Sequence, residues 1–141
     1  MGNEKQQQFL DYVKKISAYS EATGLMFWDL RTGAPKKGIA QRSEVIGILS
    51  SEAFEMSVSE EMKEYISLFA EDTEAPPIIR KMAQECKKAY DLNKKIPAEE
   101  YKEYVILKSQ AESVWEEAKE KSDFALFQPY LEKIVDKEKK F

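Results

Sequence analysis

Apolar residues return every three or four positions through most of this chain, and this period restricts the fold to helices. Between residues 3 and 30 the repeated positions are Phe9, Tyr12, Val13, Ile16, Tyr19, Thr23 and Phe27. Such a stripe forms one face of an α-helix. Only 5 Gly and 5 Pro occur in 141 residues, which is too few for the many turns of a β-sandwich or barrel. The pattern predicts an all-α fold.

Gly, Pro and Ser interrupt the stripes and predict about six helices in an irregular bundle. The first covers residues 3–30 and the second 39–55, and the third begins after Ser57 or Ser59. The fourth begins at Pro76-Pro77, a long fifth helix spans residues 97–122, and the last begins near Asp123. The predicted inner face of the third helix consists of Met62, Tyr65, Ile66 and Phe69.

Two segments predict burial beyond a single stripe. Leu25 to Trp28 is a consecutive apolar run, and a helix that is apolar all round should lie between neighbours. The last helix should bury Phe124, Phe127, Leu131, Ile134 and Val135. It reaches Phe141 without a Gly, Asn or Pro stop, so we expect a helix cut from a longer chain.

The sequence contains 0 His, which excludes several reaction types from this chain alone. These are a His-ligated zinc site, a Ser-His or Cys-His nucleophile and a His general base. Cys86 is the only cysteine, so no internal disulfide can form, and a cytoplasmic location is expected. We interpret Cys86 as a small core residue. The net charge of −4 argues against a nucleic-acid partner, and no apolar run approaches the roughly 20 residues that span a membrane.

Acidic clusters are one candidate for chemistry. Glu99, Glu100 and Glu103 are followed by Glu120 and Asp123, which fits a Glu-Glu-x-x-Glu…Glu-x-x-Asp pattern. All-α nucleotide pyrophosphohydrolases hold magnesium with such a pattern between two helices. Lysines are interspersed among these acids, as on a solvated helix face. The magnesium site requires the carboxylates of Glu100, Glu103, Glu120 and Asp123 to converge.

The segment around Trp28 and Asp29 is a second candidate, because a Trp and a carboxylate beside a Gly/Pro turn can line a pocket. We favour a structural interpretation. In it Trp28 lies in the core, and the side chain of Asp29 or Thr32 accepts hydrogen bonds from the free amides of the turn.

Residues 28–42 also resemble a known signature. They have the form W-D-x-x-T-x-x-P-x-x-G-x-x-x-R, with Ala34 where many members carry Met. Further similar elements are Lys94-Lys95-Ile96-Pro97, Glu100-Tyr101, Trp115-Glu116-Glu117-Ala118-Lys119 and the D-F-x-x-F-x-P-x-L element at residues 123–131. Together they resemble the N-terminal region of the bacterial thermostable metallocarboxypeptidases, the carboxypeptidase Taq family.

The resemblance implies a helical parent enzyme, several times longer, that removes single C-terminal residues from peptides. One zinc or similar divalent ion would act there, held by an H-E-x-x-H helix and a downstream Glu. All these elements lie C-terminal to the matched region, so the resemblance assigns no catalytic, cofactor-binding or metal residue to this chain. Residues 1–141 would form a single N-terminal helical domain, part of the wall and lid over the substrate groove.

The implied partners are the C-terminal catalytic part, peptide substrates and a second copy in a homodimer. The segment alone is predicted to fold, to lack peptidase activity and to self-associate through an exposed apolar face. Two alternatives remain, which are the magnesium-dependent nucleotide pyrophosphohydrolase and a free-standing helical interaction domain.

Overall fold

The computed structural model describes residues 2–141, and in that range it contains six α-helices, two short 3-10 turns and no strand. The helices are α1 (Gly2–Thr32), α2 (Ile39–Ser57), α3 (Glu60–Phe69), α4 (Pro77–Asn93), α5 (Ala98–Glu120) and α6 (Gln128–Lys140). The 3-10 turns are η1 (Lys36–Gly38) and η2 (Phe124–Leu126). This confirms the all-α fold, the six helices and the long helix predicted at 97–122.

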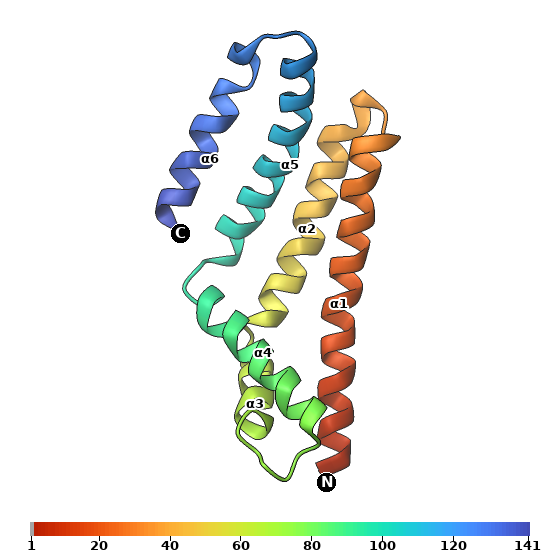
Figure 1. The fold of residues 1–141 in the computed structure, drawn as a ribbon, viewed down its shortest axis with the longest axis vertical. Helices are drawn as coiled ribbons and strands as arrows, with labels where there is room; N and C mark the ends of the chain where they lie inside the picture. Colours follow the sequence, from red (N-terminus) through yellow and green to blue (C-terminus); the bar gives the residue numbers. More distant parts are fainter. Residues whose placement is uncertain (1) are drawn as a thin grey trace.

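Four helices stand side by side in the order α1, α2, α5 and α6 (Figure 1). The helices α3 and α4 pack together at one end of this row, beside the N-terminal half of α1 (Figure 1). The molecule is therefore two layers thick at the α3–α4 end, whereas the other end is a single row of helices.

The hydrophobic core lies where α1, α3 and α4 meet. Phe9 is fully buried, and its ring centroid lies 5.3 Å from that of Tyr65 and 5.5 Å from that of Phe69. The core cluster consists of Phe9, Met62, Tyr65, Ile66, Phe69, Ala70, Ala75, Ile79 and Ala83. It includes all four residues predicted for the inner face of the third helix.

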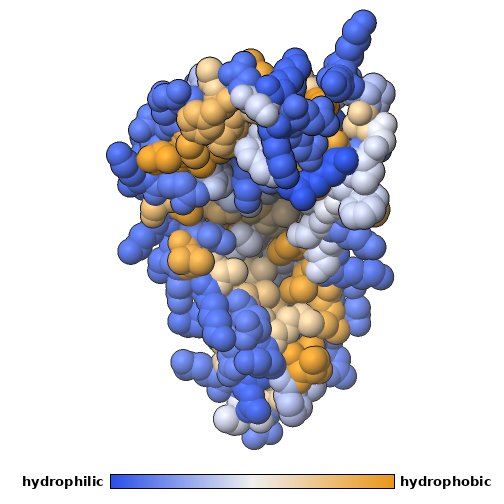
Figure 2. Space-filling view, turned by 45° about the horizontal axis from the view of Figure 1, so that its top comes forward, coloured by the Kyte–Doolittle hydropathy of each residue, from blue (hydrophilic) through white to orange (hydrophobic). Residues whose placement is uncertain are grey.

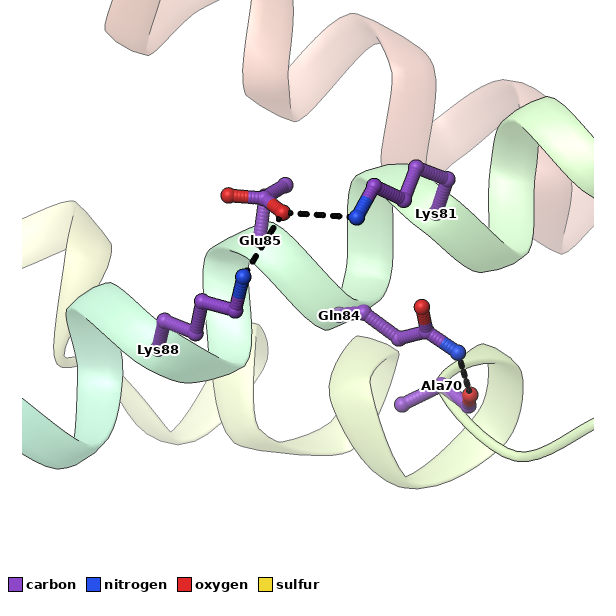
Figure 3. Close-up of polar contacts among 5 residues, drawn as sticks. All are labelled: Ala70, Lys81, Gln84, Glu85 and Lys88. Atoms are coloured by element: carbon purple, nitrogen blue, oxygen red, sulfur yellow. Dashed lines mark hydrogen bonds and ion pairs between the residues drawn. The ribbon is translucent and has the colours of Figure 1, made fainter.

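Local sequence signals explain where α3 and α4 begin and how they are joined. Ser59 caps α3, because its Oγ accepts a hydrogen bond from the amide of Met62 at 3.1 Å. Pro77 occupies the first turn of α4, where a missing amide hydrogen costs nothing. Gln84 of α4 donates from Nε2 to the carbonyl oxygen of Ala70 at 3.1 Å, while Glu85 pairs with two lysines of its own helix (Figure 3).

Small residues allow α2 and α5 to approach closely. Ser43, Gly47 and Ser51 follow each other at four-residue steps on α2, and all three are buried. Ser109 of α5 is also fully buried. A Cβ added at Gly47 would lie 2.3 Å from Cγ1 of Ile106, so a larger residue at position 47 would force Ile106 to move.

Two burial predictions are wrong. Leu25 and Trp28 are 66% and 69% exposed, because α1 is an outer helix of the row and no other helix within residues 2–141 covers these two side chains. α6 contains no buried residue, and Phe124, Leu131 and Val135 are all exposed. The reason is that α6 is the other outer helix and packs mainly on α5 and η2.

Candidate functional site

The signature of residues 28–42 builds the turn between α1 and α2. Asp29 lies at the end of α1 and Arg42 near the start of α2, and the carboxylate Oδ2 accepts a hydrogen bond from Nη1 of Arg42 at 2.9 Å. Both side chains are about two-fifths exposed, at 42% and 41%. The acidic and basic positions of the signature therefore clamp the two helices together across the turn.

The free amides of the turn are bonded by the main chain. The amides of Gly33 and Ala34 donate to the carbonyl oxygen of Asp29 at 2.9 and 2.8 Å. The hydroxyl of Thr32 donates to the carbonyl oxygen of Trp28 at 2.8 Å. The prediction that the side chain of Asp29 or Thr32 would bind these amides is wrong, because the carbonyl of Asp29 already does so. The prediction of a buried Trp28 is wrong as well.

The two acidic clusters of the magnesium alternative do not converge. Glu103 and Glu120 lie on the same helix, 17 residues apart, which is about 26 Å along the axis. Glu103 pairs with Lys137, and Asp123 caps η2 by accepting from the amide of Ala125. Nowhere in residues 2–141 do three or more Asp, Glu, Cys or His side chains gather closely enough to hold a metal ion. This arrangement contradicts the magnesium alternative.

One of these acidic residues, Glu103, takes part in a contact between α5 and α6, which we call the α5–α6 clasp. It consists of Glu103, Tyr104, Lys137 and Glu138. Lys137 donates to Glu103 at 2.8 Å and holds the pKa of that carboxyl below its ordinary value. The hydroxyl of Tyr104 donates to Glu138, and this hydrogen bond to a carboxylate, together with burial, raises the pKa of Tyr104 to about 12.

Cys86 packs beside the core cluster and is partly buried. Burial is the main cause that raises the pKa of its thiol, so the reactive thiolate is disfavoured. Its position agrees with the interpretation of Cys86 as a small core residue.

Two hollows open on the row of helices. A central groove of about 390 Å³ lies among α1, α2 and α5, and its lining includes Phe27, Phe54, Tyr101, Tyr104 and Lys108. A larger cleft of about 640 Å³ lies between the α1–α2 turn and the C-terminal half of α5. Figure 2 shows a face hollowed near its middle, with apolar residues in the hollow and hydrophilic residues around it.

The lining of these hollows favours contact rather than reaction. The larger cleft combines cations of the turn, such as Arg31 and Lys36, with the carboxylates Glu117 and Glu120 of α5. Arg31 also reaches across to Glu112 at 3.5 Å. Neither lining contains a cysteine, so no nucleophile of the Cys type is available there. Within residues 2–141 no helix is both long enough and apolar enough to cross a membrane.

Comparison with known proteins relates the whole helical segment to one group of enzymes. A family model described as carboxypeptidase Taq (M32) metallopeptidase matches residues 8–141. The chain is 51% identical over 137 residues to Carboxypeptidase 1 of Bacillus subtilis, which covers 96% of this chain and 27% of that protein. It is 30% identical over 133 residues to Thermostable carboxypeptidase 1 of Pyrococcus furiosus, covering 94% of this chain and 27% of that protein.

A solved structure shows the same helical arrangement. The crystal structure titled BsuCP superimposes with a TM-score of 0.94 at 50% sequence identity. The match covers 97% of this chain and 28% of that chain. The chain thus spans about a quarter of the length of the relatives it matches.

Proposed function

Because the chain belongs to the carboxypeptidase Taq (M32) family of metallopeptidases, we propose that it forms the N-terminal helical wall and lid of an enzyme that releases C-terminal residues from peptides. The observation that carries this proposal is the family match over residues 8–141, together with a coverage of only 27% of the Bacillus subtilis relative. The remaining three quarters of such a protein would carry the catalytic residues.

The residues described here do not fit the metal site of such an enzyme. The sequence has 0 His, and no cluster of potential ligands forms within residues 2–141. A zinc or similar divalent ion would therefore be held by the C-terminal part, where it would polarise the peptide carbonyl and activate water. The segment by itself would be inactive.

The chain's own contribution would be mechanical shielding. A row of helices that is one layer thick over half its length suits a wall, because its exposed residues can contact the rest of the enzyme on one side. Such a wall limits access to the reacting bond and excludes water. We take residues 1–141 as one domain, since α1 runs through both the core cluster and the single-layer end.

The partners and the cellular location that we propose follow from the same family membership. The partners would be the C-terminal catalytic part, peptide substrates and a second copy in a homodimer. The lone, partly buried Cys86 suits a reducing cytoplasm.

The gene gives the first test. The proposal expects the reading frame to continue beyond codon 141 into an H-E-x-x-H helix. A stop codon there would favour the free-standing interaction domain instead.

Fragment complementation gives the second test. The purified chain, supplied with zinc or cobalt ions, should not hydrolyse a blocked dipeptide. Addition of the part of Bacillus subtilis Carboxypeptidase 1 that lies outside the matched 137 residues should restore chelator-sensitive hydrolysis. Hydrolysis by the chain alone that a chelator abolishes would contradict the proposal.

A further inference from the structure

The central groove has a lining suited to packing against another protein segment. Phe54 is buried beneath it and stacks on Tyr101 with ring centroids 4.3 Å apart. Phe27 of α1 forms part of the opposite wall. The groove is therefore an aromatic trough between three helices.

Beyond the groove, α5 carries an exposed tryptophan on the same face as Tyr101 and Lys108. Tyr101, Lys108 and Trp115 are seven residues apart, which places them on one stripe of the helix. Trp115 is 47% exposed, so a large part of its apolar surface is free to be buried by a partner. An elongated occupant lying along α5 would cover all three residues.

Hydroxyl groups in the lining do not favour an extended peptide as occupant. Thr23 donates to the carbonyl of Ser20, Ser57 donates to that of Phe54, and Tyr104 donates to Glu138. An extended peptide is held mainly by hydrogen bonds to its main chain. These three donors are already used within the chain, and the rest of the lining combines apolar side chains with Ser20, Ser50, Asn93 and Lys108.

The relatives indicate what covers the groove. The chain corresponds to 27% of Bacillus subtilis Carboxypeptidase 1, so nearly three quarters of the related protein lies outside it. Domains bury helices in two or more layers, and the central groove lies where the row of helices has no second layer over it. A helix satisfies its main-chain N–H and C=O groups with its own hydrogen bonds. It can therefore lie in an apolar groove without leaving buried main-chain groups unbonded.

We propose that the central groove receives an amphipathic helix from the part of the enzyme that follows this segment in its relatives. This inference rests on the proposed function and adds the contact surface and the nature of the occupant. The helix carries an apolar stripe against Phe27, Tyr101 and Trp115, with an acidic residue opposite the exposed Lys108.

The test is a nuclear magnetic resonance titration of this chain. The probes are overlapping peptides that cover Bacillus subtilis Carboxypeptidase 1 outside the matched 137 residues. We expect a peptide with helical periodicity to shift the signals of Tyr101 and Trp115. Lys108→Glu should weaken its binding by about tenfold, as reversal of a contact charge does. Lys15→Glu, an equal charge change on an exposed part of α1 outside the groove, should leave it unchanged.

Several results would overturn the inference. They are the absence of any peptide that shifts the groove signals, equal effects of the two lysine variants, and the same shifts caused by a blocked dipeptide substrate. Concentration-dependent shifts of Tyr101 in the chain alone would also overturn it, because a second copy would then fill the groove. If complementation restores hydrolysis while the groove signals stay unchanged, the proposed function survives and only this inference fails. If a helical peptide fills the groove but hydrolysis is never restored, the proposed function fails instead.

Discussion

At the scale of single residues, the contact between α2 and α5 depends on Gly47. A side chain there would meet Ile106 at 2.3 Å. Alanine favours a helix interior over glycine by about 1 kcal/mol, but forced overpacking costs about 1–3 kcal/mol. We expect Gly47→Ala to lower the free energy of unfolding by about 1 kcal/mol, measured by urea unfolding followed by circular dichroism.

Gly24 provides the matched control within α1. An added Cβ there would have no atom within 4 Å. Gly24→Ala should raise the free energy of unfolding by about 0.5–1 kcal/mol, because only the helix preference changes. Equal effects of the two substitutions would contradict the close packing at Gly47.

The Asp29–Arg42 ion pair makes a smaller contribution, since both side chains are about two-fifths exposed, at 42% and 41%. Exposed pairs stabilise proteins by about 0.2–1 kcal/mol. A double-mutant cycle with Asp29→Asn and Arg42→Gln should give a coupling energy in this range at low salt. High salt should reduce the coupling through screening. A coupling that is unaffected by salt would rule out an electrostatic clamp.

At the scale of secondary structure, α6 depends on a polar contact that titrates. Lys137 lowers the pKa of Glu103 in the fold, so this contact stabilises α6 above the ordinary carboxyl pKa of 4.5 and is lost as pH falls through the lowered value. Tyr104 has its pKa raised to about 12, so its contribution is complete below its ordinary value of 10 and is lost as pH rises toward 12.

We therefore expect α6 to loosen first at both extremes of pH. Amide chemical shifts of α6, followed by nuclear magnetic resonance across the pH range, would measure this. Glu103→Gln should remove the acid transition and Tyr104→Phe the alkaline one. Persistence of both transitions in the two variants would show that other groups control α6.

The positions of the helices along the chain were predictable from the sequence. The elements that pack against each helix were not. The breaks at Gly33, Pro35 and Gly38 and at Pro76-Pro77 are local steric effects, so they appear in the sequence alone. The period of Leu131 and Val135 predicts a helix face but does not say what covers it. For this reason the expected burial of α6 was wrong.

The candidate site shows the same limit. The signature contains Asp29 and Arg42 at opposite ends of a Gly/Pro turn, and that charge pattern could have predicted their ion pair. The separation of Glu103 and Glu120 also followed from an unbroken helix between them. The central groove could not be found this way, because its walls come from three helices whose order in the row is set by long-range packing.

At the scale of the whole molecule, the exposed apolar residues predict self-association when the segment is isolated. Leu25 and Trp28 lie three residues apart on α1 and form an exposed apolar patch. We expect light scattering to show a mass that rises with concentration and with added sulfate, which strengthens apolar contact.

Paired substitutions test this patch. Replacing Leu25 and Trp28 together by Ser should reduce the association, whereas Leu92→Ser, an isolated exposed position on α4, should not. A strict monomer at high concentration would contradict the prediction.

The great length of α1 has one more consequence. Phe9 anchors this helix in the core cluster, and Trp28 lies 19 residues further along the same unbroken rod, about 28 Å away. A rotation of the rod by about 10° around Phe9 would carry Trp28 through about 5 Å. If α1 moves as a rigid body, a slight tilt at the α3–α4 end therefore displaces the opposite end of the domain by several ångströms.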